Sequence, residues 1–122
     1  MTLTTSIPVK RTTQSRLNTV DFSNLGFGNY ISDHMLVAKY DSGAWQEPQV
    51  IPYGDLMLSP AMLSLHYGQA VFEGMKAFAM NDGAINVFRI ERHHKRLNRS
   101  LDRMCMPAIS EELFVSGLEA VV

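Results

Sequence analysis

The residues best suited to chemistry lie in one short stretch, HYGQAVFEGMKAF, at positions 66–78. It combines three aromatic rings with a carboxylate, Glu73, and an amine, Lys76. A carboxylate among buried aromatic rings is costly unless it finds a partner. Glu73 and Lys76 could therefore form a pair beside a ligand, or a plain surface ion pair that contributes little to stability. The aromatic rings are equally compatible with an ordinary core.

A second candidate is a group of arginines that recurs on one side of a predicted helix, with Lys95 close by. The group consists of Arg92, Arg96, Arg99 and Arg103. Three interpretations are open: a solvated face, a helix that contacts nucleic acid, and a single arginine whose planar fork binds a phosphate. The pattern of residues alone does not choose among them.

Metal binding is not expected. His93 and His94 are adjacent, and neighbouring helical residues point about 100° apart, which is a poor arrangement for chelating one ion. His94 falls on the apolar side of the predicted helix, so a partly buried histidine is expected there. The single cysteine, Cys105, excludes an internal disulfide and a structural zinc site of the CxxC kind.

Other well-known catalytic motifs are absent from the sequence. It contains no P-loop and no triad signature, and GFGNYIS has only two of the three glycines of a dinucleotide fingerprint. The GFG stretch instead predicts a glycine-flexed loop with Phe27 at its tip.

The first half of the chain predicts short extended elements. MLVAKY at 35–40 predicts a strand that ends in a turn at 41–43. A second strand is expected within 49–58, interrupted by Pro52 and Gly54. Ser59 as N-cap and Pro60 at the first helical position predict a short helix that runs to about His66.

The second half predicts a hairpin followed by two helices. Apolar stretches at 74–80 and 84–90 flank Asn-Asp-Gly, a strong signal for an antiparallel hairpin. Helical periodicity then starts at Ile90 and ends before Pro107. Ser110 is expected to open the last helix, which ends on the apolar stretch LEAVV without a glycine or a basic last turn. That ending suggests a chain cut within a longer protein.

Composition predicts one modest ordered domain. The chain has 122 residues, of which 46% are hydrophobic, and its formal net charge is -1. This charge provides no bulk attraction for nucleic acid or anionic membranes. No apolar run approaches the roughly 20 residues that span a bilayer. Residues 1–20, which contain three basic and no acidic side chains, are expected to be a flexible segment, with an organelle transit peptide as the alternative. The ordered domain is expected at 21–122.

Two blocks of sequence, LHYGQAVFEGMKAF and INVFRIERHHKRLNRSLDRMCMP, resemble the branched-chain amino acid aminotransferases. These are fold-type IV enzymes that use pyridoxal 5′-phosphate. SDHMLVAKY and LSPAMLSLHYG extend the likeness, which covers roughly 21–122. The HYG…FEG block is specific, because related D-amino acid aminotransferases and aminodeoxychorismate lyases share the fold but do not normally carry it.

The resemblance implies an α+β fold: a two-layer sandwich in which an antiparallel sheet has helices packed on one face, as in the smaller N-terminal domain of these enzymes. It implies that Arg96 binds the cofactor phosphate. The residues implied for the substrate pocket or its edge are Phe27, Tyr67, Phe72, Glu73 and Lys76, with Tyr67 reaching the pocket of the neighbouring subunit in a homodimer.

No catalytic residue is expected within the chain. None of its lysines matches the motif of the family's Schiff-base lysine, which is expected beyond Val122 in a C-terminal domain. The implied function is transfer of the amino group of leucine, isoleucine or valine to 2-oxoglutarate, in a cytoplasmic enzyme, and the isolated chain is expected to be inactive. The alternatives are a stand-alone module that binds nucleic acid through the four arginines and a scaffold protein derived from an enzyme domain.

Overall fold

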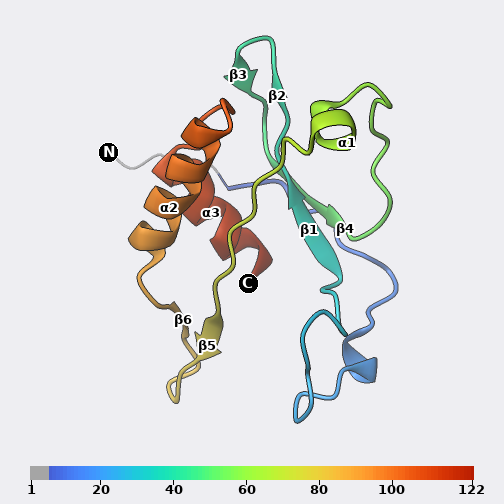
Figure 1. Ribbon diagram of the computed structural model, residues 1–122. Helices are drawn as coiled ribbons and strands as arrows, with labels where there is room; N and C mark the ends of the chain where they lie inside the picture. Colours follow the sequence, from blue (N-terminus) through green and yellow to red (C-terminus); the bar gives the residue numbers. More distant parts are fainter. Residues whose placement is uncertain (1–5) are drawn as a thin grey trace. The chain divides into compact units, whose positions relative to one another are not determined.

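The computed structural model describes residues 6–122, which divide into two compact units between Asp55 and Leu56. Unit 1 comprises residues 6–55 and unit 2 begins at Leu56. The described residues combine short antiparallel strands with three α-helices (Figure 1). The predicted α+β class is therefore confirmed.

Unit 1 contains two antiparallel strand pairs. β1 (His34–Val37) pairs with β4 (Gln49–Pro52), and β2 (Tyr40–Asp41) pairs with β3 (Ala44–Trp45). The second pair turns through Ser42 and Gly43, which both have positive φ, 51° and 84°, as tight hairpin turns require. The single strand predicted at 35–40 is thus divided, because its two ends pair with different partners. β4 ends at Pro52, as the missing amide donor predicts.

Val50 lies at the centre of unit 1 and is 1% exposed. Besides facing Leu36 across the β1–β4 pair, it forms a parallel bridge with Val9. Its amide donates to the carbonyl of Pro8 at 2.9 Å, and its carbonyl accepts from the amide of Lys10 at 2.8 Å. The N-terminal segment thus supplies backbone partners to β4.

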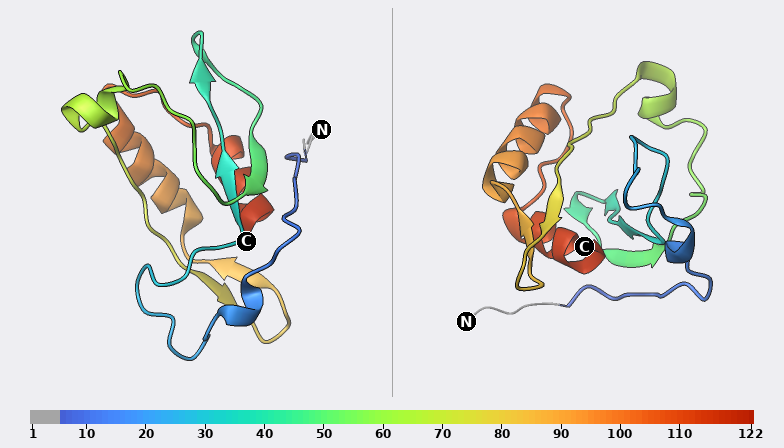
Figure 2. Two further views of the ribbon diagram at one scale, coloured as in Figure 1. Left: turned by 90° about the vertical axis from the view of Figure 1, so that its right-hand side faces the viewer. Right: turned by 90° about the horizontal axis from the view of Figure 1, so that it is seen from below.

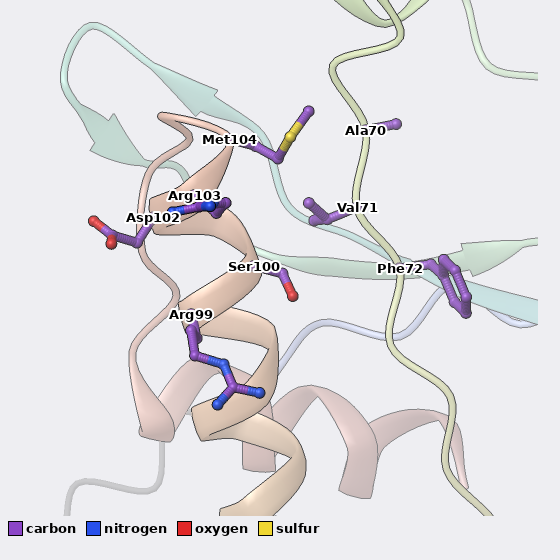
Figure 3. A pocket seen from close by; sticks show the side chains of 8 residues that line it. All are labelled: Ala70, Val71, Phe72, Arg99, Ser100, Asp102, Arg103 and Met104. Carbon is purple, nitrogen blue, oxygen red and sulfur yellow. The ribbon is translucent and has the colours of Figure 1, made fainter.

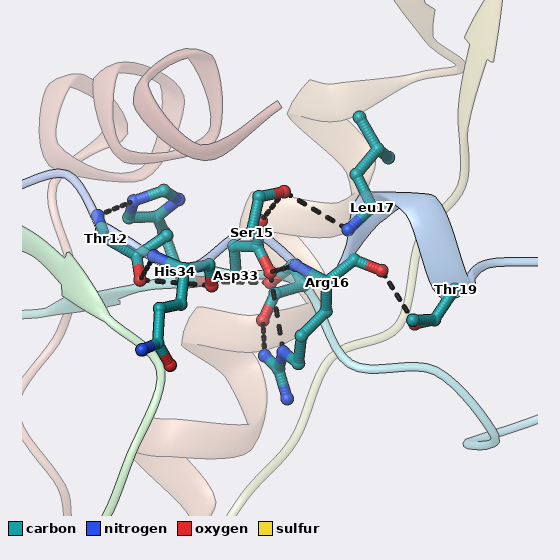
Figure 4. A network of polar contacts seen from close by, with 9 residues as sticks. Thr12, Ser15, Arg16, Leu17, Thr19, Asp33 and His34 are labelled. Atoms are coloured by element: carbon teal, nitrogen blue, oxygen red, sulfur yellow. Dashed lines mark hydrogen bonds and ion pairs between the residues drawn. The ribbon is translucent and has the colours of Figure 1, made fainter.

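A polar network links the same segment to the start of β1 (Figure 4). The Thr12 amide donates to Nε2 of His34 at 3.0 Å, and the hydroxyl of Ser15 donates to the Asp33 carboxylate at 2.6 Å. The Arg16 amide donates to the same carboxylate at 2.9 Å. The bond from Ser15, followed by that from Arg16, lowers the pKa of Asp33 below its usual value.

These contacts were not expected from composition, which predicted a flexible segment at 1–20. Within the described residues, the segment carries a short 3₁₀ helix at Leu17–Thr19 and the specific partners given above. Residues 1–5, which belong to the same prediction, lie outside the described residues. The prediction rested on the small number of apolar side chains in this segment. The structure shows that polar groups of the segment instead form hydrogen bonds with residues at the start of β1.

Unit 2 begins with a turn and a short helix, α1 (Leu63–Tyr67). The predicted start at Pro60 is wrong. The hydroxyl of Ser59 accepts from the Ala61 amide at 3.2 Å and its carbonyl accepts from the Met62 amide at 3.1 Å, so Ser59 closes a turn instead of capping the helix. The helix ends at Gly68, whose φ of 63° is the usual left-handed ending.

The predicted hairpin and the two later helices are confirmed. β5 (Ala77–Ala79) and β6 (Ile85–Val87) pair antiparallel on either side of the Asn-Asp-Gly stretch. α2 spans Ile90–Arg103 and α3 spans Glu111–Val121. The hydroxyl of Ser110 accepts from the Leu113 amide at 3.1 Å, which is the N-cap bond that the sequence predicted.

The strand pairing differs from the predicted single sheet. The strands of residues 6–122 form three two-stranded pairs, β1–β4, β2–β3 and β5–β6. Residues 68–76, between α1 and β5, form no strand ladder within the described residues. This segment instead runs beside α2 in both views of Figure 2.

Few apolar side chains are buried. Among the described residues, Val50 and Leu101 are the buried hydrophobic ones, whereas several large side chains are largely in solvent. The most exposed of these are Phe27, Met57, Tyr67 and Phe72. None of the helices formed by residues 6–122 has the length and apolar character that a bilayer crossing requires.

Candidate anion-binding site

The segment 68–76 turns one set of side chains toward α2. Burial alternates along it: Gln69, Val71, Glu73 and Met75 are partly buried and their neighbours are exposed, which is the period of an extended chain. Figure 3 shows Val71 pointing to the α2 side and Phe72 pointing to the opposite side. The side-chain amide of Gln69 donates to the Met104 carbonyl at 2.8 Å and ties one end of the segment to the end of α2.

Glu73 is bound by two side chains of α2. Its carboxylate is 5% exposed and accepts from Nε of Arg96 at 2.7 Å, while Nη2 of Arg96 donates to the other carboxylate oxygen. Nδ1 of His93 lies 2.9 Å from that second oxygen. Because an ionised carboxylate only accepts, Nδ1 of His93 carries the donated proton. His93 and Arg96 are one helical turn apart, so both reach the same carboxylate.

Arg96 and Glu73 are both charged at neutral pH. The guanidinium of Arg96 is the main cause that lowers the pKa of Glu73 to about 2; desolvation opposes this shift and the bond from His93 adds to it. The same carboxylate raises the pKa of Arg96. The two-pronged contact is therefore a charge-assisted pair at neutral pH.

This pair predicts a specific loss of stability in acid. The pKa of Glu73 is about 2 in the folded chain against an ordinary value of 4.5. A lowered pKa stabilises the fold above the ordinary value, and that stabilisation is lost as the pH falls through the folded value. We expect the difference in unfolding free energy between the chain and its Glu73→Gln variant to shrink as the pH falls from 4.5 to about 2. Denaturant unfolding followed by circular dichroism measures it, and parallel pH curves for the two chains would contradict the prediction.

Part of the Arg96 guanidinium stays available for another partner. Its side chain is 55% exposed, and Nη1 has no hydrogen-bond partner among the described residues. It lies in a depression of about 460 Å³ on α2, lined by Arg92, His93, Lys95, Arg96 and Arg99. The lining carries no carboxylate. A phosphate group fits this surface, because the lining charges are positive and Nη1 offers unused donors.

The contact between Glu73 and Lys76, which the sequence left open, is not formed. Glu73 bonds to Arg96 and His93, and Lys76 is exposed. The physical reason is the period of the segment, since residues three apart in an extended chain point to opposite faces. Glu73 faces α2 and Lys76 does not.

The aromatic residues predicted for the substrate pocket are largely exposed to solvent, and none of them lines the depression that contains Arg96. Phe72 is 92% exposed and lines a depression of about 630 Å³ between the segment 68–76 and the second half of α2 (Figure 3). Tyr67, at the end of α1, is 82% exposed. Phe27 belongs to unit 1 and is fully exposed. Their predicted roles therefore stay predictions.

The structure adds His93 to the site, a residue for which the sequence suggested only a poor metal ligand. The sequence did contain a signal for this role of His93. It lies three positions before Arg96 on a predicted helix, and residues at that spacing share a helical face and can bind the same carboxylate. His94 is partly buried as predicted: its Nε2 lies 2.7 Å from the Ile109 carbonyl and its ring packs 5.4 Å from that of Phe114. Across residues 6–122, no grouping of His, Cys, Asp and Glu could hold a metal ion.

Comparison with known proteins identifies the sequence relatives. No family model matches the chain. The chain is 48% identical over 103 residues to "Branched-chain-amino-acid transaminase 1" of Bacillus subtilis, covering 84% of this chain and 29% of that protein. It is 46% identical to a "Probable branched-chain-amino-acid aminotransferase" of Staphylococcus epidermidis, with coverages of 84% and 28%. It is 44% identical to "Branched-chain-amino-acid aminotransferase" of Mycolicibacterium smegmatis, with coverages of 82% and 27%.

The resemblance to the branched-chain aminotransferases is confirmed. At 103 residues, the match is longer than either unit, so both units share in the likeness to these aminotransferases. The chain spans less than a third of the length of the aminotransferases that it matches.

Proposed function

We propose that the 122 residues form the smaller N-terminal domain of a branched-chain aminotransferase, which transfers the amino group of leucine, isoleucine or valine to 2-oxoglutarate. The observation that carries this proposal is the 48% identity over 103 residues, combined with coverage of 29% of the relative. In the complete enzyme, which we place in the cytoplasm, a C-terminal domain supplies the lysine that links to the cofactor.

Arg96 would hold the phosphate of pyridoxal 5′-phosphate. This is supported by the positive lining of the depression on α2 and by the unused donors on Nη1. The cofactor, when bound, supplies the electron sink for amino transfer. The chain's own part is to bind the phosphate and to shape the pocket, in which we place Phe27, Phe72 and, from the second subunit of a homodimer, Tyr67. Lys76 would lie at the pocket edge.

Exposed apolar side chains in unit 2 support a domain that is covered by other protein. Tyr67 is 82% and Phe72 92% exposed, and Leu65 and Phe88 are also largely in solvent. A stand-alone scaffold protein would rarely leave so many large apolar side chains in water. We therefore favour a domain that docks against the rest of an enzyme.

The extended segment 68–76 supports the predicted sheet. Its alternating burial is that of a strand, although it forms no ladder within the described residues. We infer that in the complete enzyme it becomes part of one antiparallel sheet with helices on one face, the arrangement expected of the fold-type IV family. The nucleic-acid alternative has no comparable support, because the relatives reported above are named as aminotransferases and not as nucleic-acid-binding proteins.

An activity comparison tests the proposal. The product of the native gene and the 122-residue chain are purified separately, and each is assayed with leucine, isoleucine and valine against 2-oxoglutarate in the presence of pyridoxal 5′-phosphate. We expect transamination by the gene product and none by the chain. Activity of the chain alone, or a native reading frame that stops after Val122 and yields an inactive protein, would contradict the proposal.

A further inference from the structure

We propose that Glu73 is a positioning residue, which together with His93 orients the guanidinium of Arg96 so that its Nη1 edge is presented to a phosphate. This inference rests on the proposed function, in which Arg96 is the phosphate anchor.

Arg96 uses some of its donors for Glu73 and leaves others unused. Nε and Nη2 are both directed to the Glu73 carboxylate, which occupies one side of the planar guanidinium. A second hydrogen on Nη2 faces the Gly74 carbonyl at the long distance of 3.5 Å. Nη1 is thereby left as the outer group. An arginine side chain has many rotamers, and a two-pronged contact on one edge selects those that turn the other edge outward.

The side chains of Glu73 and Arg96 differ in burial. The Glu73 side chain is 5% exposed and that of Arg96 is 55% exposed. The carboxylate is thus the fixed member, and the guanidinium extends from it into the depression lined by Arg92, Lys95 and Arg99. Donors that are held in place before a ligand arrives lose less freedom on binding.

His93 holds the carboxylate itself. Its Nδ1 donates to the oxygen that also accepts from Nη2 of Arg96. The segment that carries Glu73 is also tied at its start to the C-cap of α2, because the side-chain amide of Gln69 donates to the Met104 carbonyl at 2.8 Å. The carboxylate is therefore restrained by both its own bonds and those of its segment.

Simple charge makes the opposite prediction, which allows a decisive test. A carboxylate beside Arg96 repels an incoming anion, so its neutralisation should strengthen phosphate binding if charge alone matters. If Glu73 acts by orienting Arg96, neutralisation should weaken phosphate binding. The two explanations differ in the sign of the effect.

The experiment uses the ¹⁵N-labelled chain and follows the Nε–H signal of the Arg96 side chain by NMR. Inorganic phosphate and pyridoxal 5′-phosphate are the ligands, pyridoxal is the control without a phosphate, and Arg96→Gln identifies the signal. Glu73→Gln is compared with Glu91→Gln, which removes the same charge from an exposed residue in the first turn of the same helix. We expect Glu73→Gln to weaken phosphate binding about 5- to 10-fold and Glu91→Gln to leave it within about 2-fold.

Equal or tighter phosphate binding by a folded Glu73→Gln chain would overturn the positioning role. A parent chain whose Arg96 signal does not respond to either phosphate ligand would overturn the phosphate anchor itself, and the inference with it. If Glu73→Gln does not fold, His93→Phe removes the imidazole donor to the carboxylate and leaves Glu73 and Arg96 in place. It is expected to speed exchange of the Arg96 Nε proton and to weaken phosphate binding about 2-fold, and unchanged values would overturn the proposal.

Discussion

Replacement of Leu101 with alanine is expected to lower the free energy of unfolding by about 2–4 kcal/mol. Leu101 is 4% exposed and lies near the end of α2, where its carbonyl also accepts from the Met106 amide at 2.9 Å. Truncation removes buried methyl groups and leaves a cavity that the surroundings fill only in part. Small domains are stable by only about 5–15 kcal/mol, so this loss would be a large share of the total.

Denaturant unfolding followed by circular dichroism measures this effect. Leu65→Ala is the matched control, because Leu65 is the same residue type in α1 and is 68% exposed. We expect it to change the free energy of unfolding by at most about 0.5 kcal/mol. Equal losses in the two variants would show that burial of Leu101 does not stabilise unit 2.

Replacement of Arg96 with lysine is expected to weaken pyridoxal 5′-phosphate binding by the complete enzyme about 10- to 100-fold. Lysine retains the positive charge, but a compact ammonium cannot contact Glu73 with two groups and keep a further edge for phosphate. Binding of pyridoxal, which has no phosphate, should change little. The expected loss therefore comes from the geometry of the donors.

Cofactor retention after gel filtration, together with equilibrium titration of the apoenzyme, measures this second effect. Arg103→Lys provides the control, since Arg103 is another exposed arginine in the last turn of the same helix and has no contact with Glu73. Wild-type affinity in Arg96→Lys would rule out Arg96 as the anchor. An equal loss for pyridoxal and its phosphate would point to a damaged fold instead.

Local signals were sufficient for the elements that surround the site. The Asn-Asp-Gly turn, the period of α2 and the Ser110 cap each depend on residues within a few positions of one another, and each is present in the structure. The predicted helix start at Pro60 failed because Ser59 had two possible local bonding patterns. The turn, and not the helix cap, is the one that formed.

The contacts of the N-terminal segment were beyond such signals. Ser15 and Arg16 bond to Asp33, which is 18 and 17 positions away along the chain. Composition indicates how much apolar surface a segment can bury, but it does not indicate which distant acceptor its hydroxyl or amide groups will reach. The pairing of the strands was also beyond local signals, because tertiary packing decides which strands pair.

The sequence by itself determined the likeness to branched-chain aminotransferases and the presence of Glu73, His93 and Arg96, the last two on one turn of a helix. Only the tertiary structure decided that Glu73 bonds to this turn, 20 and 23 positions away, and not to Lys76. The reason is that side-chain direction in an extended segment alternates, so the fold chooses which face meets α2. Once Glu73 faced the helix, its buried charge required the donors of Arg96 and His93.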